Sequence, residues 1–382
     1  MKKVLFVGHM LRGHMLVFHL PYMQWFQERG YEVSLCSHND TEDPNVVVPY
    51  CDHYYDLDFK RSPLHPGNLA VYRQLRRIIE ENDFELIHCH TPVGGMLTRL
   101  AARKARKKGT RVIYTAHGFH FFTGAPLKNW LIFYPAEYFL AHFTDLLLTI
   151  NQEDYERAQR FPARKIGYVE GVGVDMTRFE GPVDHAAVHE GLRLEPNAPV
   201  VICVGEHIPR KNHETALRAV AAISRAELLF CGVGELEGDL RALAEALGAA
   251  DRVHFLGFRK DVPELLKASD AFVFPSFQEG LPVSLMEAMA AGLPCVASNV
   301  RGNADLIRPG EGGSLRAPDD VEGFTEDLRA LLRSPALRAS MGERNRRVVQ
   351  AYSLPVVKER MAGYYEAELK EREARACRSS SL

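Results

Sequence analysis

FPSFQEGLPVSLMEAMAAGLPCVAS, residues 274–298, is the segment whose pattern is easiest to interpret as structure. The apolar run that ends at Pro275 predicts a strand, and residues 276–280 predict a loop. The apolar stretch that follows predicts a helix that ends near Gly292, before LPCVAS forms a second strand. A strand, a covering helix and another strand in this order are typical of a parallel sheet.

The same alternation extends along the chain on both sides of this segment. Short apolar runs rich in β-branched residues predict strands, and the longer amphipathic stretches between them predict helices. The predicted strands are residues 3–8, 31–36, 85–89, 111–116 and 144–150 in the first half, and 199–204, 226–231, 252–256, 270–274 and 294–297 in the second. Two such series predict an α/β fold of two Rossmann-like, doubly wound domains that face a cleft.

The length of 382 residues fits two domains, at about 100–200 residues for each domain. We expect an N-terminal domain over residues 1–180, a polar, irregular linker over 181–197 and a C-terminal domain over 198–353. Residues 354–375 predict one long helix that crosses back to the N-terminal domain. Residues 376–382 predict a disordered tail.

Composition and charge exclude several classes of protein. The net charge of −2 provides no overall field for nucleic acid. The seven cysteines are scattered and form no pair with metal-ligand spacing, so neither a disulfide framework nor a zinc site is expected. No uncharged apolar run is long enough for a transmembrane helix, and the apolar run after Lys3 is shorter than a secretory signal. We therefore predict a cytoplasmic protein.

Two glutamates in segment 274–298 are the first candidate site residues. Glu279 precedes the predicted helix and Glu287 lies about one turn inside it. The amides of Gly280, Leu281 and Val283 at the start of the helix would attract a diphosphate. A carboxylate one turn along can accept hydrogen bonds from both hydroxyls of a ribose. The spacing alone is equally compatible with two solvated glutamates that flank a buried helix.

Segment 274–298 resembles the Glu-x7-Glu motif of retaining glycosyltransferases with the GT-B fold, and specifically of glycosyltransferase family 4. The resemblance implies that Glu287 binds the ribose hydroxyls and that Glu279 lies near the donor sugar. It implies that the backbone of Gly280, Leu281 and Val283 contacts donor hydroxyls and phosphate. It also implies that a nucleotide-sugar is bound without an essential metal.

VVICVGEHIPRKNHETALRAV, residues 200–220, is the second candidate segment. Arg210 and Lys211 follow a strand that ends at Gly205, where cations would stabilise a departing diphosphate. An isolated Arg-Lys pair is more often a solvated loop. The family's loop reads Gly-Arg and then Lys-Gly or Lys-Asn, so Lys211 fits its lysine but Glu206 stands in place of its arginine. Whether Arg210 replaces that charge, and whether Glu206 faces the sugar, stays open.

Two segments of the first half supply the remaining candidates. VGHMLRGHMLVFH, residues 7–19, lacks the spacing of a dinucleotide-binding loop but resembles the family's N-terminal glycine-rich loop, which borders acceptor and diphosphate. The residues that match it are Gly8, Arg12, Gly13 and His14. In YTAHGFHFF, residues 114–122, His117 matches a family histidine near the donor sugar, although a lone histidine is more often structural.

HCHTP, residues 88–92, raises the question of a metal. His88 and His90 would point to the same face of a strand, but no third or fourth ligand is near them in the sequence. We interpret the pair as packing at the end of a strand. The sequence therefore predicts no metal and no cofactor, with the nucleotide-sugar as a co-substrate.

Other segments, including FHLPYMQWFQERGYEV and YTAHGFHFFTGAPLKNWLIFYPAEYFLA, resemble bacterial family 4 enzymes of capsule and exopolysaccharide assembly. The resemblance implies transfer with retention from a UDP-sugar to a glycan or to a sugar on undecaprenyl diphosphate. Two alternatives stay open, namely a GT-B nucleotide-sugar epimerase and a non-catalytic nucleotide-sugar binding protein. The donor sugar, the acceptor and the linkage are not determined by the sequence.

TRLAARKARKKG, residues 98–109, predicts contact with an anionic membrane. On a helix, Arg99, Arg103, Arg106 and Lys107 would share one face. The aromatic residues of segment 119–143 would let part of it enter the interface as an amphipathic helix. The alternative is that the charges are solvated and the aromatic residues form core. The acceptor implied by the resemblance favours a peripheral position at the inner membrane face.

Overall fold

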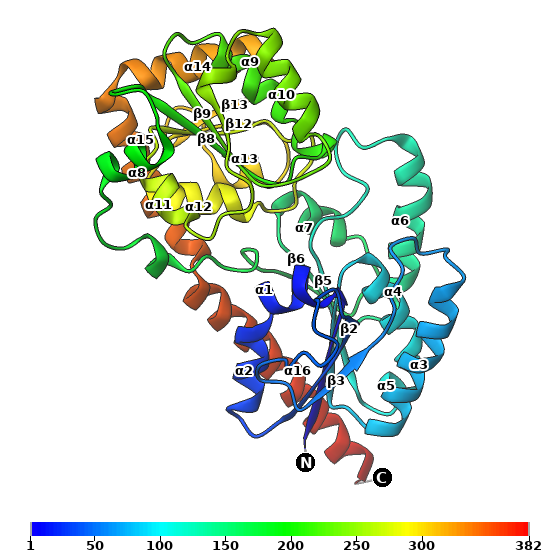
Figure 1. Ribbon diagram of the computed structural model, residues 1–382. Coiled ribbons are helices and arrows are strands. Elements are labelled where there is room, and N and C mark those ends of the chain that lie inside the picture. The colour runs from blue at the N-terminus through cyan, green and yellow to red at the C-terminus, as the bar shows by residue number, and fades with distance from the viewer. Residues whose placement is uncertain (1, 381–382) are drawn as a thin grey trace. The chain divides into compact units, whose positions relative to one another are not determined.

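The computed structural model describes residues 2–380 and divides the chain into two compact units (Figure 1). Unit 1 comprises Met1–Val172 and Pro355–Leu382, and unit 2 comprises Gly173–Leu354. The chain thus leaves unit 1 after Val172, earlier than the predicted boundary at 180. The expectation that ligands lie in a cleft between two domains stays a prediction.

Unit 1 contains a seven-stranded parallel sheet with the order β3-β2-β1-β4-β5-β6-β7. Its strands are β1 (Lys3–Met10), β2 (Glu32–His38), β3 (His53–Asp56), β4 (Leu86–His90), β5 (Arg111–Ala116), β6 (Leu146–Thr149) and β7 (Lys165–Tyr168). All five strands predicted for this half are present. The two that were not predicted, β3 and β7, lie at the edges of the sheet and are half-exposed, so their sequences lack a continuous apolar run.

Helices accompany the strands of unit 1. They are α1 (Leu16–Phe18), α2 (Leu20–Gln27), α3 (Gly67–Asn82), α4 (Pro92–Ala101), α5 (Arg103–Lys107), α6 (Leu127–Ala141) and α7 (Gln152–Ala158), with a π-helical turn, η1 (Leu11–Met15), after β1. The buried core includes the inner residues of β4 and β5 together with side chains of α3 and α4. β4 and β5 are buried along their whole length, including the polar side chains of His88, His90 and Arg111.

Unit 2 contains a six-stranded parallel sheet with the order β10-β9-β8-β11-β12-β13. Its strands are β8 (Val200–Val204), β9 (Glu227–Cys231), β10 (Val253–Phe255), β11 (Ala271–Phe274), β12 (Cys295–Ser298) and β13 (Gly313–Arg316). The five predicted strands are present. The edge strand β13 was missed because its sequence, GSLR, is short and polar.

The helices of unit 2 are α8 (His185–Leu192), α9 (His213–Ala221), α10 (Glu237–Ala246), α11 (Val262–Lys267), α12 (Val283–Ala291), α13 (Asn303–Leu306), α14 (Val321–Arg333) and α15 (Pro335–Val349). The prediction of an irregular linker over 181–197 is wrong where α8 forms. The side chain of Asp184 accepts a hydrogen bond from the Ala187 amide and caps this helix. The two parallel sheets confirm the predicted pair of Rossmann-like folds.

The last helix, α16 (Leu354–Ser380), packs onto unit 1 (Figure 1). Tyr365 is fully buried, and its hydroxyl lies 2.8 Å from Nδ1 of His88 in β4. The prediction of a disordered tail over 376–382 is wrong as far as Ser380, because the strong helix formers before it continue the helix. Residues 381–382 lie outside the described part of the chain.

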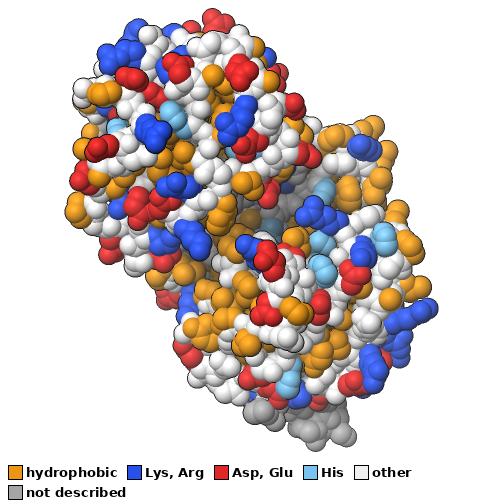
Figure 2. Space-filling model, viewed as in Figure 1, with side chains coloured by type: hydrophobic (Ala, Val, Ile, Leu, Met, Phe, Trp, Pro, Cys, Tyr) orange, Lys and Arg blue, Asp and Glu red, His pale blue; other side chains and the backbone are white. Residues whose placement is uncertain are grey.

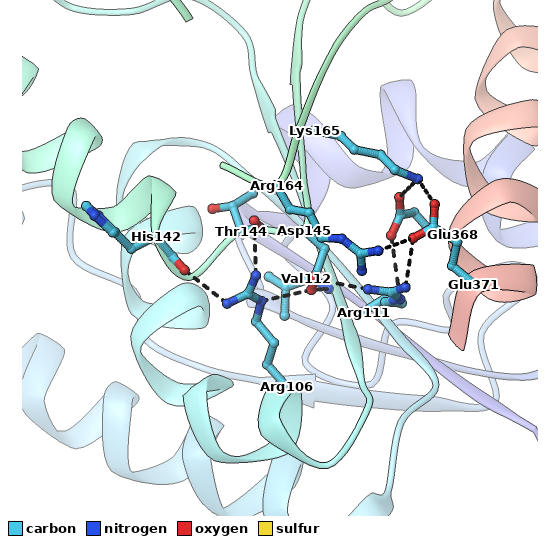
Figure 3. Close-up of polar contacts among 10 residues, drawn as sticks. All are labelled: Arg106, Arg111, Val112, His142, Thr144, Asp145, Arg164, Lys165, Glu368 and Glu371. Carbon is cyan, nitrogen blue, oxygen red and sulfur yellow. Dashed lines mark hydrogen bonds and ion pairs between the residues drawn. The ribbon is translucent and has the colours of Figure 1, made fainter. Parts of the chain in front are cut away.

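A network of charged side chains joins α16 to the sheet of unit 1 (Figure 3). Arg111 in β5 is 2% exposed and pairs with Asp145 at 3.3 Å, with Glu371 at 3.1 Å and with Glu368 at 3.6 Å. Lys165 in β7 pairs with both glutamates. A buried charge that loses its partner is strongly destabilising, so the network ties the helix to unit 1.

None of the helices in the described part of the chain combines the length and the apolar composition needed to cross a membrane.

Candidate functional site

The predicted cations of unit 2 meet one glutamate. Nζ of Lys211 lies 2.8 Å from Oε1 of Glu279, and Nη1 of Arg210 lies 3.2 Å from the same oxygen. Glu279 is 6% exposed, so its charge is compensated by these two cations in a largely buried position. The structure therefore brings together three residues that the sequence placed in two separate segments.

The loops that carry these residues are bonded to each other. After β8 the chain passes through Gly205 and the turn η3 (Pro209–Lys211) to Asn212, which has a φ of 53°. Nδ2 of Asn212 donates to the carbonyl of Pro275 at 3.1 Å, and the Phe277 amide donates to the carbonyl of Arg210 at 2.9 Å. The predicted residue Glu206 is exposed beside this pair of loops.

The start of α12 leaves backbone donors available. No side chain caps the helix at Pro282, the residue that precedes it. The Met286 amide donates a hydrogen bond to the Pro282 carbonyl. The amides of the first turn, beginning at Val283, have no acceptor within the helix, and the aligned peptide dipoles make this end positive. Gly280 and Leu281 lead directly into it. Free amides at a positive helix end can bind a phosphate group, and the donor-binding role of these residues stays a prediction.

Glu287 lies one turn inside α12 and is engaged by a residue that sequence reasoning missed. Its Oε1 accepts a hydrogen bond at 2.9 Å from Nη1 of Arg178, in the turn η2 (Met176–Phe179). Burial raises the pKa of the Glu287 carboxyl, and Arg178 partly opposes that shift. Arg178 is visible in the sequence as the basic residue of VEGVGVDMTRF, residues 169–179, but nothing in the sequence links it to Glu287.

A second missed group supports the loop that carries Glu279. Nε of the buried Arg301 donates to the Glu279 carbonyl at 2.9 Å. Gly302 has a φ of 79°, and a Cβ there would lie 2.2 Å from the carbonyl oxygen of Gly280. Only glycine fits this approach. In the sequence, the only hint of this close approach is that Gly302 stands between polar residues shortly after LPCVAS.

The glycine-rich loop of unit 1 packs against Met15 and binds the carboxylate of Asp40. A Cβ on Gly8 would lie 2.3 Å from Sδ of Met15, so a larger residue there would displace the Met15 side chain. The amides of Arg12 and Gly13 donate to the two carboxylate oxygens of Asp40, at 2.6 and 3.1 Å. Two successive amides that converge on one carboxylate make a small anion-binding turn. Asp40 was not predicted, because it lies after a different strand.

The predicted histidines of unit 1, His14 and His117, lie together with ring centroids 4.7 Å apart. Nε2 of His14 lies 3.1 Å from Nε2 of His19, and Nε2 of His117 lies 3.3 Å from Nδ1 of His90. Burial lowers the pKa of His14 to about 4 and lowers the pKa values of the other three histidines well below the usual range. All four rings are therefore neutral at neutral pH.

Arg99 does not belong to the predicted basic face. Its side chain is fully buried, pairs with Glu137 at 2.9 Å and lies over the ring of Tyr114 at 3.9 Å. The helix ends at Ala101 and a separate helix, α5, follows, so residues 99 and 103 do not continue one face. Phe119 and Phe121 are also core rather than surface.

A basic pocket of about 610 Å³ nevertheless lies beside α5. Its cationic lining residues are Arg103, Lys104, Arg106, Lys107, Arg164 and Arg375. The neighbouring helix α6 exposes apolar side chains, and Figure 2 shows hydrophobic groups on the surface of unit 1. The exposed fractions are 73% for Leu127, 69% for Leu131, 59% for Ile132 and 55% for Phe139.

Comparison with known proteins places both halves of the chain in related families. Residues 185–348 match the glycosyl transferases group 1, and residues 3–151 match the family described as glycosyl transferase 4-like. EpsD of Bacillus subtilis (strain 168), which is named as a glycosyltransferase, is 39% identical over 374 residues that cover 96% of this chain and 97% of EpsD.

A second relative is the UDP-Gal:alpha-D-GlcNAc-diphosphoundecaprenol alpha-1,3-galactosyltransferase of Escherichia coli. It is 32% identical over 265 residues, which cover 66% of this chain and 68% of the relative. Neither these relatives nor the matched families support the alternatives of an epimerase or a non-catalytic binding protein.

Two solved structures show the fold. Alr3699/HepE of Anabaena, in complex with UDP and glucose, superposes with a TM-score of 0.81 and 18% identity over 96% of this chain and all of that chain. Sucrose-phosphate synthase of Thermosynechococcus elongatus superposes with a TM-score of 0.78 and 19% identity over 96% and 99% of the two chains. These likenesses confirm the predicted GT-B arrangement of two Rossmann-like domains.

Proposed function

This chain belongs to the family of glycosyl transferases group 1, and we propose from that premise what it transfers and to what. The donor is a UDP-sugar. The acceptor is a glycan or a sugar linked to undecaprenyl diphosphate, and the new bond retains the anomeric configuration of the donor. The product is part of a bacterial capsule or exopolysaccharide.

The observation that carries this proposal is the cluster of Lys211, Arg210 and Glu279 in the loops next to the start of α12. The free amides of that helix receive the diphosphate, and Glu287 receives the ribose hydroxyls. Lys211 and Arg210 stabilise the negative charge that grows on the diphosphate as the sugar leaves. Two fixed cations supply the charge that a divalent metal provides elsewhere, so we expect transfer to need no metal.

The position of Glu279 argues for a role in holding the cations rather than in attacking the sugar. One of its oxygens accepts from both Lys211 and Arg210, and its carbonyl accepts from Arg301. A carboxylate so engaged is a poor nucleophile. This favours a substitution in which the acceptor approaches on the face from which the diphosphate departs.

The histidines of unit 1 belong to the sugar and acceptor side of the proposal. His117 is neutral and half-buried, so its ring can donate or accept a hydrogen bond to a sugar hydroxyl without adding charge. His14 and the turn of Arg12 and Gly13 lie on the same unit. The Asp40 carboxylate on these two amides occupies the kind of position that a phosphate of the acceptor would take.

The comparisons support a UDP donor and a lipid-linked acceptor. The relative from Escherichia coli is named for both UDP-Gal and a diphosphoundecaprenol-linked sugar, and the Anabaena structure contains UDP. An acceptor with a polyprenyl chain lies in a membrane. We therefore place the enzyme in the cytoplasm, resting on the inner face of the membrane through α5 and α6 of unit 1.

The test is a panel of nucleotide-sugars, each incubated with the purified chain with and without a polyprenyl-diphosphate-linked sugar, in buffer containing EDTA. Mass spectrometry should show the acceptor heavier by one sugar, with an equal amount of UDP released. A donor that isomerises without acceptor would indicate an epimerase. Donor binding without any product across the panel would contradict the proposed transfer.

A further inference from the structure

Four histidines of unit 1 converge on one point, although they come from distant parts of the sequence. His14 lies in η1, His19 joins α1 to α2, His90 ends β4, and His117 follows β5. One ring nitrogen from each lies within 4.8 Å of the others. His88 and His90 have no third or fourth metal ligand near them in the sequence. The fold supplies three.

Two nitrogen–nitrogen distances within the cluster are close to those of a tetrahedral site. A zinc ion with Zn–N bonds of 2.0–2.1 Å holds its ligand nitrogens about 3.3 Å apart. The nitrogens of His14 and His19 are already 3.1 Å apart, and those of His90 and His117 are 3.3 Å apart. Small ring rotations would bring the two pairs to a common ion.

The electronic state of the rings suits a metal. A neutral imidazole offers one nitrogen lone pair to a metal, and in each of the two close nitrogen pairs one ring would change its tautomer to present that lone pair. In the part of the chain that the structure describes, Nδ1 of His19 and Nε2 of His90 are buried without a hydrogen-bond partner. Each of these two rings therefore keeps one buried nitrogen that the hydrogen bonds among the four rings do not use.

The surroundings restrict which ion would fit and how it would enter. The donor set contains only imidazoles, which favour Zn²⁺, Cu²⁺ and Ni²⁺ over the oxygen-seeking Mg²⁺ and Ca²⁺. His19 and His90 are buried, whereas His14 and His117 are half-exposed and give access from one side. The ring of His88 lies beside that of His90, with centroids 4.0 Å apart and planes tilted by 50°, and it is itself held by Tyr365 and Thr115.

We propose that unit 1 binds one divalent transition-metal ion, Zn²⁺ in the first place, through His14, His19, His90 and His117. The ion is not needed for transfer. If the proposed function is right, an ion at this point competes with the sugars for His14 and His117 and inhibits the enzyme. The binding itself does not rest on the proposed function.

The test uses Co²⁺ as a visible probe for Zn²⁺, added to the full chain after metal removal and without donor or acceptor. One equivalent should give the intense visible absorption of a four-coordinate site, and one equivalent of Zn²⁺ should abolish it. His14→Gln and His90→Gln should each weaken Co²⁺ binding by more than about tenfold, since even lost second-shell partners cost that much. His142→Gln, an exposed histidine of the same unit, is the matched control.

The result that overturns the proposal is Co²⁺ binding that is unchanged in His14→Gln, or a weak six-coordinate spectrum in the wild-type chain. Because His14 is half-exposed, its variant should fold, and circular dichroism checks this. If His90→Gln misfolds, Co²⁺ binding by His14→Gln alone still tests the proposed metal site. Failure of metal binding would leave the transfer assay unaffected, so the two proposals are tested separately.

Discussion

At the scale of single residues, the site of unit 2 is organised around one oxygen, Oε1 of Glu279, which binds both cations. The two cations differ in environment. The side chain of Lys211 is 13% exposed and that of Arg210 is 41% exposed. Because solvent screens an exposed charge more strongly, Lys211 should act more strongly on a departing diphosphate.

Lys211→Ala is accordingly expected to lower kcat by about 10²–10³-fold while it changes donor affinity much less, since the lost charge matters most in the transition state. Steady-state kinetics with varied donor would measure both quantities. Lys260→Ala removes an exposed lysine of the same unit and should change neither. If Arg210→Ala were severe and Lys211→Ala silent, the roles of the two cations would have to be exchanged.

The pair of Arg178 and Glu287 predicts a pH effect. Burial raises the pKa of Glu287 above its usual 4.5, and Arg178 limits the rise. The carboxylate accepts ribose hydroxyls best when ionised, so UDP affinity should be full above the folded pKa and should fall as the pH drops through it. Arg178→Ala should raise that pKa further and move the fall in affinity to higher pH.

Calorimetric titration with UDP over a series of acidic pH values would record this shift. Arg178→Lys retains a positive charge and should restore much of the wild-type profile. If UDP affinity fell over the same acidic pH range in the wild-type chain and in Arg178→Ala, Arg178 would not control the pKa of the Glu287 carboxyl.

At the scale of elements, α16 is joined to unit 1 by buried charge as well as by Tyr365. Glu368 has no exposed side-chain surface and pairs with Arg111 and Lys165. Glu373, on the same helix, is largely exposed and pairs with Lys2. The helix thus provides a buried pair and an exposed pair for direct comparison.

Glu368→Ala should lower the free energy of unfolding of unit 1 by about 1–3 kcal/mol, because it removes one of the three carboxylate partners of the buried Arg111 and one of the two partners of Lys165. Glu373→Ala should have little effect, since exposed pairs contribute little. Urea unfolding followed by circular dichroism would compare the two variants. Equal destabilisation by both would contradict the assignment of the network as the attachment of α16.

The elements that could be predicted from the sequence are those with a strong local pattern. The central strands were predictable because both of their faces are buried, which makes them continuous apolar runs. The edge strands β3, β7 and β13 are short and half-exposed, and α8 lies in a polar stretch, so local pattern did not reveal them.

The residues of the candidate site also differ in how far the sequence could predict them. Glu279, Glu287 and Lys211 lie in short contiguous motifs, where spacing and resemblance both apply. Their partners Arg178 and Arg301 come from other segments and are brought close only by tertiary packing. The roles of the motif residues in binding and catalysis stay predictions.

At the scale of the whole molecule, unit 1 combines a basic pocket beside α5 with an exposed apolar face on α6. Cations near an anionic surface contribute about 1 kcal/mol each, and exposed apolar side chains gain from entry into the interface. Arg106 is paired with Asp145, so the attraction to an anionic surface comes from the exposed cations around it.

Replacement of Arg103, Lys104, Lys107 and Lys108 by Gln should therefore abolish flotation with anionic liposomes at low salt, while activity on a soluble acceptor is kept. High salt should weaken wild-type binding, because screening shortens the range of the attraction. Matched replacement of four exposed arginines of unit 2, Arg225, Arg241, Arg333 and Arg347, should leave flotation intact. Equal binding to neutral and anionic liposomes would contradict an electrostatic contribution to membrane binding.

We propose that unit 2 holds the nucleotide of the donor through the start of α12 and Glu287. The most direct measurement is a calorimetric titration of UDP into the wild-type chain and into Glu287→Ala, with the exposed Glu264→Ala as control. We expect one UDP site in the wild type and the control, and an affinity about tenfold to a hundredfold lower in Glu287→Ala, since a charge-assisted hydrogen bond contributes about 1.5–3 kcal/mol. Unchanged UDP affinity in a folded Glu287→Ala chain would contradict the claim.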